Sequence, residues 1–153
     1  MQKSHLHIQV SVHDQELKLR RGRKIIRRYP VSTSRFGLGS EENSHKTPLG
    51  KFRISDKVGE AMPAGTIFVG RVPLRPDDPL PLTEDLVLSR ILWLDGIEPH
   101  NANTRDRFIY IHGTRHEDKI GTPASHGCIR MTSVDLIQLF ERVPVGTEVV
   151  ISA

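Results

Sequence analysis

Apolar and polar residues alternate along several short stretches of this chain. The first stretch covers residues 6–12, a second covers 17–19 and a third covers 25–33. Successive side chains of a β-strand point to opposite faces, so alternation with a period of two predicts strands with one buried face. Residues typical of turns separate the stretches, and Pro30 favours an edge strand because proline donates no ladder hydrogen bond. The chain is therefore expected to open as a β-meander.

The β pattern continues through most of the remaining chain. Strands are predicted at 51–58, 66–72, 108–111 and 147–151. The apolar run 86–94 fits a strand or a helix by its period, and its length and the following Asp95-Gly96 favour a buried strand. Long loops are predicted at 34–44, which is rich in glycine and serine, and at 73–81, where prolines exclude a helix or a central strand.

One helix is predicted near the end of the chain. The segment Thr132-Ser133-Val134-Asp135 has the form of a capping box, in which the threonine begins the helix. Four apolar residues follow at helical spacing, namely Leu136, Leu139, Phe140 and Val143, and Pro144 ends the helix. The expected fold class is mainly β, with this single helix packed on the sheet.

Length and charge narrow the possible functions. A chain of 153 residues suits one domain, able to bury roughly 70% of its unfolded surface, and no linker or repeat divides residues 1–153. No apolar run approaches the ~18 residues of a membrane span. The net charge of +4 includes a basic cluster at 20–28, but aromatic residues make up only 5% of the chain and offer few platforms for base stacking. A nucleic-acid partner is not expected, and attraction to another anionic polymer accounts for the charge at least as well.

Cys128, the single cysteine, is the strongest candidate for reaction chemistry. A lone cysteine is more often a buried structural residue than a nucleophile. Here the neighbours are small and polar, with His126 two positions before the cysteine and Arg130 two positions after it. A free thiol has a pKa of about 8.5, so a nucleophilic cysteine needs an imidazole to take its proton or a cation to stabilise the thiolate. Gly127 permits a positive φ or the close approach of a ligand.

Two histidines are candidate bases for this cysteine. His112 ends a predicted strand, where it can be held rigidly, and His126 lies in the same loop as the thiol. A tetrahedral intermediate also needs donors for its oxyanion, and the backbone N–H groups of Gly127 and Cys128 are the expected source. Arg130 fits either a solvated surface charge or a guanidinium fork that binds a carboxylate.

Two other hypotheses compete with a thiol enzyme. A metal site would use His112, His116, His126 and Cys128 as nitrogen and sulfur ligands. The first two are four residues apart, a spacing that suits a helix, but the Gly113-Thr114 pair between them argues against one. The second alternative is a non-catalytic module that binds the cell wall.

The motif Ser125-His126-Gly127-Cys128-Ile129-Arg130, preceded by His112-Gly113-Thr114, resembles the L,D-transpeptidase family that carries the YkuD catalytic domain, including its ErfK/YbiS-like members. Thr47-Pro48-Leu49-Gly50-Lys51-Phe52 resembles the Thr-Pro-x-Gly-x-Phe/Tyr segment of the same family. Val31-Ser32-Thr33-Ser34 resembles the strand end that precedes it. Together these matches extend from about Leu6 to Ile151.

The resemblance implies a YkuD-type β-sandwich or barrel-like domain and a cysteine acyltransferase acting on peptidoglycan stem peptides, with no cofactor. It implies that Cys128 forms a thioester acyl-enzyme and that His112 is the general base. The supporting residues would be Gly127, His126, Ser125 and Gly113, the last through a carbonyl that fixes the imidazole tautomer. Arg130 would recognise the carboxylate of the donor peptide. An L,D-carboxypeptidase, which transfers the acyl group to water, would use the same residues, so the sequence leaves both reactions open.

The resemblance also implies a role in cell wall biogenesis and cell shape, sensitivity to carbapenems, and action in the periplasm or cell envelope. The first five residues, Met1-Gln2-Lys3-Ser4-His5, contain no apolar core of a secretory signal, so a cytoplasmic location stays open as well. The sequence does not determine the acceptor, the oligomeric state, or the roles of His116 and the 34–44 loop.

Overall fold

A computed structural model describes residues 5–83 and 85–153 of the chain. The first three strands are β1 (Leu6–Ser11), β2 (Glu16–Arg21) and β3 (Lys24–Pro30). They pair antiparallel in chain order, which confirms the predicted meander, and β3 lies at the edge of the sheet as Pro30 suggested. The alternating apolar residues Ile8, Val10, Leu17 and Leu19 are buried.

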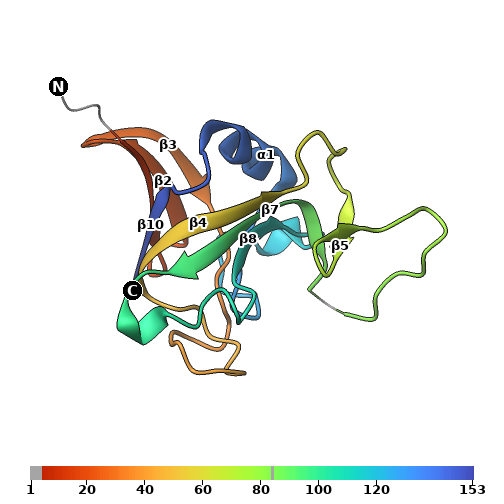
Figure 1. Cartoon of the computed structure of the whole chain (residues 1–153), viewed down its shortest axis with the longest axis horizontal. Helices are drawn as coiled ribbons and strands as arrows, with labels where there is room; N and C mark the ends of the chain where they lie inside the picture. The colour runs from red at the N-terminus through yellow and green to blue at the C-terminus, as the bar shows by residue number, and fades with distance from the viewer. Residues whose placement is uncertain (1–4, 84) are drawn as a thin grey trace.

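The remaining strands extend this meander into one ten-stranded mixed sheet (Figure 1). They are β4 (Gly50–Val58), β5 (Ile67–Val69), β6 (Val72–Pro73), β7 (Val87–Gly96), β8 (Tyr110–Gly113), β9 (Ile129–Met131) and β10 (Glu148–Ser152). The main path runs β3-β2-β1-β10-β4-β7-β5-β6, and β8 joins β7 to β9. The β1–β10 and β8–β9 pairs are parallel, and the other pairs are antiparallel.

The predicted helix is α1 (Ser133–Arg142), and it packs on β7 and β8 (Figure 1). Its N-cap is Thr132, whose side chain accepts a hydrogen bond from the backbone N–H of Asp135, as the sequence predicted. Two short 3₁₀ helices, η1 (Pro99–Asn101) and η2 (Glu117–Lys119), were not predicted. The expected class, mainly β with one α-helix, is confirmed.

Strand β7 is the central element of the sheet. Residues 88–94 are all buried, which confirms the prediction of a buried strand for the apolar run. It pairs with β4, β5 and β8 along its edges, and α1 packs on it, so most of its side chains lie in the interior of the fold.

Apart from shifts at strand ends, two segments differ from their predicted assignment. The stretch 66–72 forms the hairpin β5–β6, because Gly70 and Arg71 both have positive φ and make a turn inside it. Residues 129–131, expected in the cysteine loop, form β9, which pairs in parallel with β8, and Arg130 also makes an isolated antiparallel bridge to Ser32. A strand of three residues has too short a pattern to be found by periodicity. None of the described helices is long and apolar enough to cross a membrane.

Candidate active site

Cys128 immediately precedes β9 and is partly exposed. Its Sγ accepts a hydrogen bond from the backbone N–H of Tyr110 at 3.2 Å, and its thiol donates to the carbonyl oxygen of Phe108 at 3.3 Å. Tyr110 begins β8 and Phe108 lies two residues before it, so the start of β8 and the segment that leads into it hold the sulfur in position. An N–H donor aimed at sulfur favours the thiolate, while the Phe108 carbonyl favours the protonated thiol.

The surroundings of Cys128 keep its thiol protonated in this conformation. Burial of the sulfur and the negative charge of Asp85 raise its pKa to about 12. Three groups lower the pKa of the thiol but do not outweigh these effects, namely the Tyr110 N–H and the guanidinium groups of Arg130 and Arg107. The site therefore needs a base that removes the proton as the sulfur reacts.

His112 lies within β8 and is fully buried. Its Nδ1 is 2.6 Å from the carbonyl oxygen of Gly113, which can only accept, so Nδ1 carries the proton. In the neutral ring, Nε2 then holds a lone pair, and this atom has no hydrogen-bond partner among the described residues. Burial lowers the pKa of His112, so the ring is neutral at neutral pH. A neutral imidazole with an unpartnered lone pair has the protonation state that a general base requires.

Asp85, which the sequence analysis did not identify, gathers three of the predicted site residues around its carboxylate. Its Oδ1 accepts a hydrogen bond from Arg130 Nε at 3.0 Å and forms an ion pair with Arg130 Nη2 at 2.9 Å. His112 Nε2 lies 3.8 Å from Oδ1, and His126 Nδ1 lies 3.6 Å from Oδ2. Burial would raise the pKa of Asp85, but His112, Arg130 and His126 together lower it below its ordinary value. No sequence signal pointed to this residue, because it follows the proline-rich loop and belongs to no motif.

The tight turn before Cys128 is held by hydrogen bonds to its backbone. Ser125 donates from Oγ to the Cys128 carbonyl at 2.6 Å and accepts from the Gly127 N–H at 3.3 Å. Thr47 donates from Oγ1 to the Gly127 carbonyl at 3.0 Å. Gly127 has a φ of +120°, and a Cβ there would lie 3.3 Å from the Lys46 carbonyl oxygen, so a larger residue would be strained. The Thr47 segment, which the sequence linked to the site only by resemblance, thus contacts it directly.

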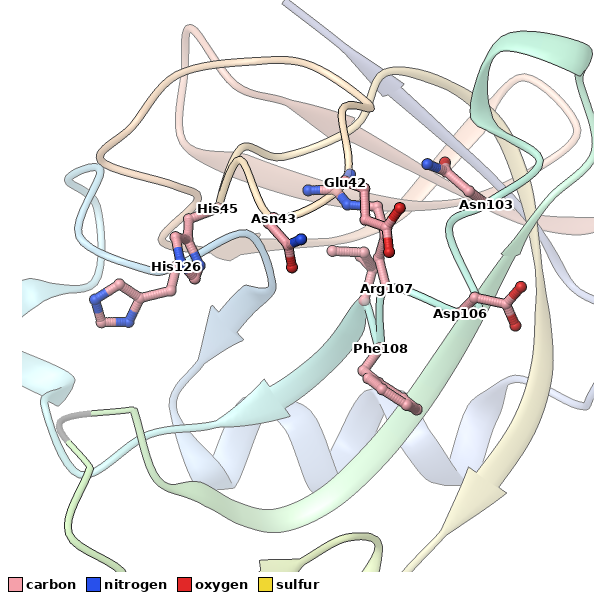
Figure 2. A pocket seen from close by; sticks show the side chains of 9 residues that line it. Glu42, Asn43, His45, Asn103, Asp106, Arg107, Phe108 and His126 are labelled. Carbon is pink, nitrogen blue, oxygen red and sulfur yellow. The ribbon is translucent and has the colours of Figure 1, made fainter.

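His126 lines two pockets at the candidate site. One pocket, of about 430 Å³, is lined by residues of the 42–45 and 103–109 segments together with His126. Figure 2 shows His45 and His126 at one end of this pocket and Asp106 at the other. Its wall includes Phe108 and Ile109, the residues just before β8, so it reaches the side of the site where the sulfur is held. His126 also lines a second pocket with Arg130.

The structure thus brings His112, His126 and Arg130 together around Asp85, and it places Ser125 and Gly127 against Cys128. His116 lines the second pocket together with His126 and Arg130. Within residues 5–83 and 85–153, no three His, Cys, Asp or Glu side chains are arranged to hold a metal ion, so the four-ligand hypothesis gains no support.

The sequence and the fold were compared with known proteins. The family model for the YkuD L,D-transpeptidase catalytic domain matches residues 5–151. The chain belongs to this family. YkuD of Bacillus subtilis (strain 168), provisionally named an L,D-transpeptidase, is 27% identical over 146 residues, which is 95% of this chain and 65% of that protein. YqjB of the same organism, also provisionally named, is 45% identical over 53 residues, 34% of this chain and 30% of that protein.

Solved L,D-transpeptidases have the same fold as this member of the family. An L,D-transpeptidase from Mycobacterium smegmatis aligns with a TM-score of 0.66 and 15% identity, covering 98% of this chain and 59% of that one. L,D-transpeptidase 3 from Mycobacterium tuberculosis with a faropenem-derived adduct gives a TM-score of 0.64 and 16% identity, with 98% and 61% covered. LdtMt1 with imipenem gives 0.63 and 19%, with 97% and 59% covered. The chain therefore spans less than two thirds of these relatives' own lengths.

Proposed function

We propose that this domain is a cysteine acyltransferase that exchanges peptide bonds in peptidoglycan stem peptides. The observation that carries the proposal is the tautomer of His112, which leaves on Nε2 a lone pair with no hydrogen-bond partner among the described residues. His112 lies in β8, whose first residue, Tyr110, donates its backbone N–H to the sulfur of Cys128. Family membership supports the reaction class. With peptidoglycan as its substrate, the enzyme is expected to act at the cell envelope.

In the proposed first step, Cys128 Sγ attacks the carbonyl carbon of the donor peptide while His112 Nε2 takes the thiol proton. The raised pKa of the thiol and the lowered pKa of His112 disfavour a stable thiolate–imidazolium pair, so proton transfer accompanies the attack. The tetrahedral intermediate then collapses, the C–N bond breaks, and His112 returns the proton to the leaving amine. A thioester on Cys128 remains.

In the proposed second step, an acceptor amine attacks the thioester carbonyl and loses its proton to His112. The C–S bond breaks, a new amide forms, and the sulfur recovers the proton. The Gly127 N–H is already bonded to Ser125, so the Cys128 N–H is the better oxyanion donor in both steps. Water in place of the amine would give the hydrolytic reaction at the same residues.

Arg130 has a narrower role in this proposal than the sequence suggested. Its guanidinium is buried and paired with Asp85, so much of its charge is already neutralised. Direct binding of the donor carboxylate by Arg130 would require Asp85 to share or release the guanidinium.

Covalent labelling tests the nucleophile. Two of the solved neighbours contain imipenem or a faropenem-derived adduct, and a β-lactam carbonyl is an acyl donor of the kind proposed. Intact-mass spectrometry after incubation with imipenem should show one adduct on the wild-type protein and none on Cys128→Ala. A folded wild-type protein without an adduct, or an adduct that persists in Cys128→Ala, would overturn the assignment.

A further inference from the structure

A second pocket adjoins the candidate active site and differs from the first in its charge. It has a volume of about 610 Å³, and its charged and ionisable lining residues are Arg35, Arg115, His116, Lys119, His126 and Arg130. It shares His126 with the pocket of Figure 2, which contains the carboxylates of Glu42 and Asp106. None of the described residues that line the second pocket is acidic. We call it the basic pocket.

Asp85 lies beside two residues of the basic pocket, 2.9 Å from Arg130 and 3.6 Å from His126. Arg130 is paired with Asp85, whereas Arg35, Arg115 and Lys119 are exposed and form no ion pair within the described parts of the chain. Glu117, a neighbour of this group in sequence, accepts a hydrogen bond from the Ser133 N–H at 2.8 Å. Like charges around one concave surface raise its positive potential and attract anions.

The wall of the basic pocket is fixed by backbone hydrogen bonds. The Ala124 N–H donates to the Thr33 carbonyl at 2.9 Å, and the Ser32 hydroxyl donates to the Thr122 carbonyl at 2.6 Å. The Gly121 N–H donates to the Val31 carbonyl at 2.9 Å. A ligand would therefore meet a wall that is already formed, which lowers the entropic cost of binding.

We infer that the basic pocket binds free carboxylates of the donor peptide, with Arg115 and Lys119 as residues that determine specificity. This inference rests on the proposed function. Because Asp85 already occupies the guanidinium of Arg130, recognition of an acidic donor passes to the exposed cations of the same pocket. The substrate class is a stem peptide with at least two free carboxylates, and peptides in which one of them is an amide bind more weakly.

Binding to the Cys128→Ala protein tests this inference without turnover. Isothermal titration would compare an acidic stem peptide with the same peptide carrying one amide in place of a carboxylate. The double change Arg115→Glu/Lys119→Glu is expected to weaken binding of the acidic peptide about tenfold and to abolish its advantage over the amide. The control, Lys24→Glu/Arg27→Glu, makes the same change in net charge on the exposed face of β3 and should alter the Kd less than about twofold.

Two results would overturn the inference. Unchanged affinity in Arg115→Glu/Lys119→Glu would show that the pocket does not contact the donor. An equal loss in the β3 control would show that only the overall charge of the protein matters. These results differ from a failure of the proposed function. In that case the wild-type protein would form no adduct with imipenem.

Discussion

Asp85 carries the only described carboxylate that pairs with Arg130, and it determines the charge balance of the site. It is 18% exposed at its side chain, and Arg130 is 3% exposed, so the pair is largely shielded from water. Its negative charge is also one of the causes that raise the pKa of Cys128. The residue therefore stabilises Arg130 and at the same time disfavours the reactive thiolate.

Replacing Asp85 by asparagine separates these two effects. In Asp85→Asn the pKa of Cys128 should fall, because a negative charge is removed and Arg130 becomes an uncompensated cation. The rate of alkylation by iodoacetamide should then rise at lower pH than in the wild type. The unfolding free energy should fall by about 1–3 kcal/mol, because Arg130 loses its charged partner. Asp77→Asn, an exposed acid in the preceding loop, is the control, and an unchanged alkylation profile in Asp85→Asn would contradict the account.

At the scale of elements, the parallel β8–β9 pair and the turn before it position the reactive groups. Neither could be derived from the alternation of residues, because β9 is short and its partner is set by the tertiary fold. The strands of the meander and β7 were predictable, since their apolar residues pack into one core and the pattern reports that burial. Cys128 and His112 could be identified as candidate nucleophile and base from their neighbours in sequence and from the resemblance of their motifs to the family. The contacts made by Asp85 and by the Tyr110 N–H depend on segments brought together only by folding.

The turn at Gly127 gives a prediction at this scale. Gly127→Ala forces an alanine into a positive φ and against the Lys46 carbonyl, so it should destabilise the fold by about 1–2 kcal/mol and slow acylation of Cys128. Gly146→Ala also has a positive φ, +94°, but nothing lies within 4 Å of its added Cβ. It should lose stability without slowing acylation, as measured by thermal unfolding and by the rate of imipenem adduct formation. Equal acylation rates in the two variants would show that the turn geometry is not required.

Across the whole molecule, the buried site limits the pH range of greatest stability. His112 is neutral in the fold and has a lowered pKa. Its contribution to the free energy of unfolding is therefore complete above its ordinary pKa of 6.5 and is lost as the pH falls below that value. Cys128 has a pKa raised from 9.0 to about 12, so its contribution is complete below pH 9 and is lost as the pH rises from 9 towards 12. Each titration changes the free energy of unfolding by about 1.4 kcal/mol per pH unit when one proton is involved.

Chemical unfolding between pH 5 and 10 should therefore show greatest stability between about pH 6.5 and 9. Cys128→Ser should flatten the decline between pH 9 and 10, and His112→Gln should flatten the decline below 6.5. If the unfolding free energy of both variants depended on pH as it does in the wild type, other groups would determine the pH range of greatest stability.

The most direct test of the central claim is a time course of intact mass after mixing the protein with a donor tetrapeptide. The wild type should gain the mass of an acyl group, and addition of an acceptor amine should remove it and yield a new peptide. Cys128→Ala should gain no mass, and His112→Ala should acylate at least about 100-fold more slowly while keeping its fold. Peptide exchange by Cys128→Ala, or acylation of His112→Ala at the wild-type rate, would contradict the account.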